Sequence, residues 1–184
     1  SVQLQVGATE IGQGAGTVFS QMAAETLHMD ISRVHIVTQQ DTDVTPFDTG
    51  AYASRQSFVT GTAVKECAQQ LKQKILEYAR TLVPGNVDRL ELEDGYILAD
   101  GKPAISLEDL AMESYYSLSN SSVLTAEVSR QVKKNTVASG CCFAEVEVDM
   151  KLGKIKVLDI VNVHDSGTLL NPQLAAMQVH GGMF

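Results

Sequence analysis

The stretch that decides the fold runs from residue 2 to residue 29 and reads VQLQVGATEIGQGAGTVFSQMAAETLHM. Its first five residues alternate apolar with polar, which is typical of a half-buried strand. The glycines from Gly7 to Gly16 end that alternation. From Thr17 to Met29 the apolar residues recur at helical spacing, at Val18, Met22, Ala23 and Leu27. The sequence therefore predicts a strand, a glycine-rich turn and a helix.

The chain that follows predicts further elements. Val34, Ile36 and Thr38 alternate as a short strand, and residues 39–55 form a long loop without a regular period. A long helix then carries one apolar stripe and ends at Pro84-Gly85; the stripe comprises Val64, Cys67, Leu71, Ile75, Tyr78 and Leu82. Asp94-Gly95 between two apolar runs predicts a β-hairpin.

The second half of the chain begins with Ser106, which caps a short helix together with Asp109. Residues 117–136 are polar and serine-rich, as in an insertion or a mobile connection. Residues 143–150 and 155–163 predict two paired long strands, and Asn171-Pro172 opens a last helix. This order predicts an α+β fold, with mixed sheets and hairpins packed with two longer helices and short helices, rather than a doubly wound parallel sheet.

Composition limits the function. Of the 184 residues, 44% are apolar and 20% are charged, as in soluble globular proteins. The net charge of -8 argues against nucleic acid and anionic membranes as partners. No apolar run is long enough to cross a bilayer, and the start of the chain does not resemble a secretory signal. The three cysteines, Cys67, Cys141 and Cys142, fit reduced thiols in a cytoplasmic protein.

The two ends of the sequence also carry an expectation. The chain starts within a strand pattern and stops within an apolar run, whereas natural termini are usually polar and solvated. We therefore expect residues 1–184 to be a single fragment of one larger domain, truncated at both ends.

The glycine-rich turn is the first candidate site. Backbone amides at the start of a helix lack partners and lie at the positive end of the helix dipole, so they can bind an oxo group or a phosphate. Gly12 and Gly14 would let a ligand approach the backbone, and the Gln13 side chain adds a donor and an acceptor. The run matches neither a dinucleotide-binding fingerprint nor a P-loop. A plain tight connection between strand and helix is the alternative.

The second candidate site is the stretch DTGAYASRQS, residues 48–57, just before the long helix. Arg55 could bind a phosphate in a bidentate manner next to the backbone donors of the helix end. The alternative is ordinary capping of the helix by Ser54, with Arg55 as a solvated charge.

The third candidate site combines HDSGT, residues 164–168, with QVHGG, residues 178–182. Cys141 or Cys142 with His164 and Asp165 could be written as a thiol-hydrolase set. This arrangement is disfavoured because neighbouring side chains of a strand point to opposite faces. The four histidines also lack the spacing of metal ligands, so no metal-binding residue is predicted.

Together, these segments resemble the molybdenum-binding subunit of the xanthine dehydrogenase/aldehyde oxidase family. TEIGQG, residues 9–14, resembles the family's T-E-M/I-G-Q-G element, and GAYASR, residues 50–55, its small-residue loop before a long helix. DSG, NP and QVHGG, from residue 165 to residue 182, resemble its D-x-G…N-P…G-Q-I-H-G-G element. Met177 stands where the family usually has glycine.

The resemblance implies a role for each candidate residue. The expected cofactor is molybdopterin, possibly in its cytosine dinucleotide form. Gln13, between Gly12 and Gly14, would bind this cofactor near the metal or the pterin. Ala53, Ser54, Arg55 and Gln56 would hold its phosphate or pterin, and Gln178 would contact the pterin.

The resemblance also implies an oxidoreductase of the molybdenum hydroxylase type, which hydroxylates purines, aldehydes or N-heterocycles. Its partners would be the remaining segments of the molybdenum subunit, and iron–sulfur and FAD domains or subunits that remove the electrons; a homodimer is compatible with it. The family's G-x-G-E-P element, which carries the general-base Glu, and its G-G-F-G-G segment are absent from this sequence. We therefore assign no catalytic residue here and expect no turnover from these 184 residues alone. A structural or interaction domain that retains only the scaffold is the alternative.

Overall fold

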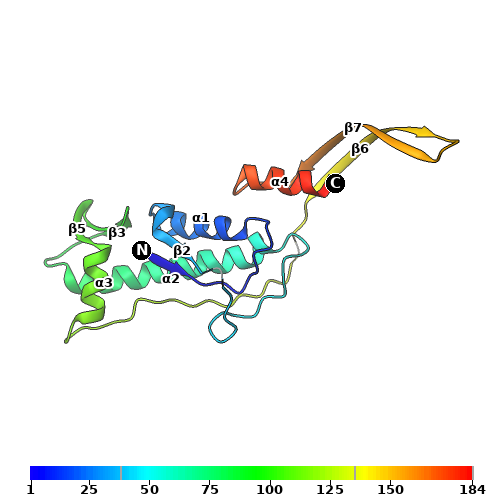
Figure 1. Ribbon diagram of the computed structural model, residues 1–184. Helices are drawn as coiled ribbons and strands as arrows, with labels where there is room; N and C mark the ends of the chain where they lie inside the picture. The colour runs from blue at the N-terminus through cyan, green and yellow to red at the C-terminus, as the bar shows by residue number, and fades with distance from the viewer. Residues whose placement is uncertain (38, 135, 184) are drawn as a thin grey trace. The chain divides into compact units, whose positions relative to one another are not determined.

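The computed structural model describes residues 1–37, 39–134 and 136–183. The chain divides into two compact units, Ser1–Lys134 and Asn135–Phe184, and each unit is described by itself. Helices and small sheets alternate along the chain, so the predicted α+β class is confirmed (Figure 1). The expectation that residues 1–184 form a single domain fragment stays a prediction.

The first unit opens with the predicted strand, turn and helix. Strand β1 (Val2–Leu4) pairs in parallel with β2 (Val34–Ile36), and helix α1 (Ala15–Leu27) and the short 3₁₀ helix η1 (Ile31–Arg33) connect them. The C-cap residue of α1 is His28, which adopts a left-handed conformation (φ 51°) and donates its backbone N–H to the carbonyls of Ala24 and Glu25. The strand predicted for Val34, Ile36 and Thr38 is confirmed as far as Ile36, because Thr38 lies outside the described residues.

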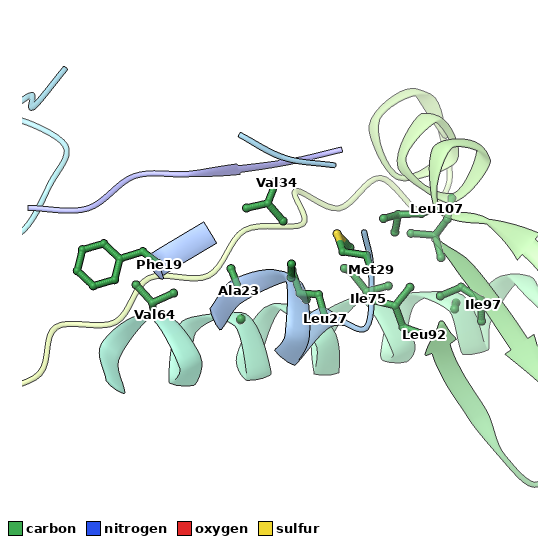
Figure 2. Packing of buried hydrophobic residues seen from close by; sticks show 14 of the residues in the cluster. Phe19, Ala23, Leu27, Met29, Val34, Val64, Ile75, Leu92, Ile97 and Leu107 are labelled. Carbon is green, nitrogen blue, oxygen red and sulfur yellow. The ribbon is translucent and has the colours of Figure 1, made fainter. Parts of the chain in front are cut away.

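The core lies between α1 and α2 (Gln56–Leu82). Helix α2 carries the predicted apolar stripe, and the helix begins eight residues before Val64, the first residue of that stripe. Figure 2 shows Phe19, Ala23 and Leu27 of α1 against Val64 and Ile75 of α2. Phe19 and Leu27 are 1% exposed, and burying a side chain of this kind contributes about 1.5–3 kcal/mol. Gly61 of α2 lies directly against α1, because a Cβ at this position would lie 2.9 Å from the sulfur of Met22.

A three-stranded antiparallel sheet covers the far end of α2. It consists of β3 (Leu90–Glu93), β4 (Tyr96–Ala99) and β5 (Lys102–Ser106). The β3–β4 hairpin was predicted from Asp94-Gly95, and both residues have the positive φ of a type I′ turn (45° and 77°). A second Asp-Gly turn leads into β5, a strand that was not predicted from the sequence.

Helix α3 (Leu107–Tyr116) follows directly, with Ser106 accepting the Asp109 N–H as predicted. The polar segment after it, predicted to be an insertion or a mobile connection, packs against α2. Residues 117–134 run along α2 without regular structure (Figure 1), and three hydrogen bonds attach them to that helix: Asn120 Nδ2 to Thr81 Oγ1 (2.8 Å), Lys74 Nζ to the Thr125 carbonyl (2.7 Å) and Cys67 Sγ to the Ala126 carbonyl (3.2 Å).

The second unit contains the predicted pair of long strands and the last helix. Strands β6 (Ser139–Asp149) and β7 (Lys154–Asp165) form an antiparallel hairpin, and α4 (Pro172–Met183) follows. The Asn171 side chain accepts the Leu174 N–H at 3.1 Å, which confirms the predicted cap. Among the described residues, no helix combines the length and the apolar character needed to span a bilayer.

Candidate functional site

Two loops of the first unit meet through a pair of glutamine side chains. Gln13 lies in the turn before α1, and Gln56 is the first residue of α2. Gln13 Nε2 donates to Gln56 Oε1 at 2.6 Å, and both side-chain amides donate to the Thr9 carbonyl, at 3.0 Å and 3.3 Å. The structure therefore brings together two predicted site residues that are 43 positions apart in the sequence.

The orientation of both amides follows from these backbone partners. The Ile11 N–H donates to Gln13 Oε1 at 2.7 Å, so this atom is the acceptor, and the two N–H groups of Gln13 point to Thr9 and Gln56. Among residues 1–37, 39–134 and 136–183, the Gln13 carbonyl accepts this one hydrogen bond and so has a lone pair left for a ligand. The side-chain amide of Gln56 has a second N–H in addition to the one that it donates to the Thr9 carbonyl.

Glu10 occupies the start of α1, where unpaired backbone amides were expected. Its Oε1 accepts the N–H groups of Gly12 (2.8 Å) and Gly14 (3.0 Å), and its Oε2 accepts that of Gly16 (2.9 Å). The expectation of free donors at this helix end is wrong for these three amides. Glu10 was not among the predicted site residues; the available signal was an acid placed just before a helix start, which the helix dipole favours.

The electrostatics of Glu10 agree with this geometry. Partial burial raises the pKa of the Glu10 carboxyl, but the N–H donors of Gly16, Gly14 and Gly12 together lower it more, so its pKa lies below the ordinary value. The group is therefore an anion at neutral pH. An anionic ligand could take these amides only by displacing Glu10.

The loop before α2 is shaped by an ion pair and by unusual backbone angles. Arg55 Nη1 donates to Asp48 Oδ1 at 2.8 Å and to the Gly50 carbonyl at 2.9 Å, and the guanidinium lies 5.6 Å from the centre of the Tyr52 ring. The Arg55 side chain is 19% exposed and that of Asp48 is 10% exposed. Arg55 is therefore not a solvated charge, and the N-cap position of α2 is Arg55 rather than Ser54.

Ala53 and Ser54, which precede Arg55, both have left-handed backbone angles (φ 51° and 52°). Such angles are uncommon outside glycine and usually occur where the surrounding structure imposes them. In this loop the Arg55–Asp48 pair closes the turn around them.

The remaining candidates lie in the second unit. Gln178 lies at an exposed position of α4. His164 and Asp165 are neighbours on β7 and so point to opposite faces of the hairpin, which disfavours a thiol-hydrolase set. Within residues 1–37, 39–134 and 136–183, no group of three or more His, Cys, Asp and Glu side chains is arranged to hold a metal ion.

Comparison with known proteins identifies the family. The family model of the molybdopterin cofactor-binding domain matches residues 1–184. The chain belongs to this family. A putative xanthine dehydrogenase molybdenum-binding subunit of Escherichia coli K12 is 47% identical over all of the chain, and a probable hypoxanthine oxidase of the same strain is 32% identical over 95% of it. The family resemblance drawn from the sequence is confirmed.

Solved structures share the fold of this molybdopterin cofactor-binding domain. Quinoline 2-oxidoreductase from Pseudomonas putida 86 superposes with a TM-score of 0.79 over 98% of the chain, at 24% identity. Carbon monoxide dehydrogenase from Oligotropha carboxidovorans gives a TM-score of 0.76 over 95% of the chain, at 27% identity. The chain spans 25% and 18% of the length of these two curated relatives, and 24% and 22% of these two structures.

Proposed function

We propose that residues 1–184 form part of the cofactor-binding region of a molybdenum hydroxylase, an oxidoreductase that hydroxylates purines, aldehydes or N-heterocycles. The observation that carries this proposal is the Gln13–Gln56 pair, which joins the two loops that resemble the family's cofactor elements. The names of the relatives support the same chemistry, because they include xanthine dehydrogenase and nicotine 6-hydroxylase subunits.

The residues present fit a pterin. A pterin ring has both hydrogen-bond donors and acceptors on its edges, and the glutamine pair offers a fixed acceptor at Gln13 and a donor at Gln56. Space for a ligand is available at Gly12 (φ 95°), where a Cβ would meet nothing within 4 Å. The anionic part of the cofactor would not bind at the amides held by Glu10.

The candidate residues then divide into groups with different roles. Gln13 and Gln56 would contact the pterin, and Gly12 and Gly14 would keep the approach to Gln13 open. Ala53 and Ser54 would offer their backbone to a phosphate or the pterin, and Arg55 would hold that loop through Asp48. Gln178 would contact the pterin from α4. When bound, the cofactor would supply the oxygen-transfer and two-electron redox chemistry.

Other parts of this assignment extend beyond the 184 residues. We propose the cytosine dinucleotide as one form of the cofactor, iron–sulfur and FAD domains or subunits as electron-transfer partners, and a cytoplasmic location. No residue of this chain is proposed as a general base, because the family's G-x-G-E-P element does not occur in it.

The proposal is tested by molybdenum and pterin content, measured by elemental analysis and by fluorescence of the oxidised pterin. The protein is the longest natural chain that contains residues 1–184, expressed with cofactor supply. We expect stoichiometric cofactor in the wild type and roughly tenfold weaker retention in Gln13→Ala, because one hydrogen bond of this kind accounts for about a factor of ten.

Gln69→Ala, at an exposed position of α2, is the matched control and should retain cofactor like the wild type. A well-folded wild-type protein without molybdenum and pterin would overturn the proposal. It would favour the alternative of a structural domain that retains only the scaffold.

A further inference from the structure

Glu10 holds the turn around Gln13 through three alternate glycines. The N–H groups of Gly12, Gly14 and Gly16 all point to one carboxylate, at distances of 2.8–3.0 Å. Gly12 and Gly14 have left-handed φ angles of 95° and 83°, which turn their amides toward the same point. Successive backbone amides arranged in this way form a concave site for an anion, and here the chain supplies that anion itself.

Gln13 is enclosed by this arrangement. The amides of the residues on either side of it bind the same oxygen atom, Glu10 Oε1. Its side chain turns back to the Thr9 carbonyl and the Ile11 N–H and then reaches Gln56. The Gln13 side chain therefore keeps its direction only while the backbone of residues 12–14 stays fixed.

Gly14 is the N-cap residue of α1, and it has no side chain that could satisfy the first amides of the helix. Glu10 performs this task from outside the helix, next to the positive end of its dipole. Bonds from backbone N–H groups to a carboxylate are about twice as strong as those between neutral groups. A neutral side chain at position 10 would weaken all three bonds at once.

We propose that Glu10 is the positioning residue for Gln13: its carboxylate fixes the turn of residues 12–16 so that the Gln13 carbonyl and the Gln56 amide face the cofactor together. This role rests on the proposed cofactor-binding function. In this arrangement the anion bound at the start of α1 is the Glu10 carboxylate and not a phosphate of the cofactor.

The test uses Glu10→Gln in the full-length protein, loaded with cofactor. The rate at which pterin fluorescence appears in the filtrate after dilution reports retention. We expect release to be roughly tenfold faster in Glu10→Gln, because the carboxamide nitrogen cannot accept an N–H and the neutral carboxamide oxygen accepts more weakly than a carboxylate. Glu25→Gln, at an exposed position of α1, is the matched control and should release cofactor like the wild type.

A double-mutant cycle separates positioning from general weakening of the fold. If Glu10 acts through Gln13, adding Glu10→Gln to Gln13→Ala will change release little further. In Glu10→Ala, formate should restore retention by occupying the three amides. The proposal would be overturned if the two substitutions multiplied each other's effect on the release rate. It would also be overturned if Glu10→Gln released cofactor at the wild-type rate.

Failure of the positioning role can be distinguished from failure of the proposed function. A wild-type protein without cofactor would refute the function, whereas the release measurements test the positioning role in a wild type that holds cofactor. Should Glu10→Gln fold poorly, amide hydrogen exchange over residues 9–17 of the wild-type protein still decides. Slow exchange at the three glycines is expected, and exchange at the rate of an open loop would contradict the arrangement.

Discussion

At the scale of single residues, Arg55 shows how one charge organises a loop. Its guanidinium lies against Asp48, and Asp48 Oδ2 also accepts the Thr60 hydroxyl at 3.1 Å. The carboxylate therefore joins the loop to the first turns of α2. Both charged side chains are mostly buried, so neither can be replaced without leaving the other short of partners.

Asp48→Asn is expected to destabilise the protein by about 2 kcal/mol, because the Arg55 charge would remain in a mostly buried position without its anion. Thermal unfolding followed by circular dichroism measures this change. Asp43→Asn, at an exposed position of the same loop, should stay within about 0.5 kcal/mol of the wild type. Equal stability of the two variants would show that the ion pair does not hold the loop.

The residue types at this site could be predicted from the sequence, but several of their partners could not. Gln13 and Gln56 stand in motifs that indicate a ligand. The partners of Glu10 are backbone amides, and the φ angles of Gly12 and Gly14 decide where those amides point. Arg55 and Asp48 are seven residues apart, and Ala53 and Ser54 between them adopt left-handed angles that a sequence pattern does not reveal.

At the scale of elements, the spacing of apolar residues in the sequence predicted most helices and strands. The stripe of α2 and the alternation of β6 are long enough to show their period. Strand β5 escaped prediction because it is five residues long and contains Pro103. The Asp100-Gly101 turn before it repeats the signal that had identified the β3–β4 hairpin, and so it could have indicated a third strand.

The cap of α3 gives a prediction at this scale. The Ser106 hydroxyl accepts the Asp109 N–H at 3.0 Å and donates to the Asp109 carboxylate at 2.6 Å. Ser106→Ala removes both bonds and is expected to cost about 1 kcal/mol of stability. The midpoint of urea unfolding measures the loss, with the exposed Ser119→Ala as control. An unchanged midpoint would mean that the packing of α3 alone determines where the helix begins.

At the scale of the whole molecule, the β6–β7 hairpin has two unlike faces within its own unit. Its register places Ala144, Val146 and Val148 opposite Ile160, Val157 and Ile155. On the other face, Glu147 and Asp149 lie opposite Lys156 and Lys154. The apolar face is open: Val157 is 53% exposed and Ile155 is 69% exposed. An isolated two-stranded hairpin is marginally stable in water, so this face needs a covering partner.

This face predicts that the 184-residue chain self-associates through it. Val157→Lys places a charge in the middle of the apolar face and is expected to weaken association at least about tenfold, because a charge must then be desolvated in the contact. Glu147→Lys changes a charge on the opposite face and should leave association unchanged. Sedimentation velocity over a range of concentrations measures both variants beside the wild type. A monomeric wild type would contradict the prediction, and equal weakening by both substitutions would place the contact elsewhere on the chain.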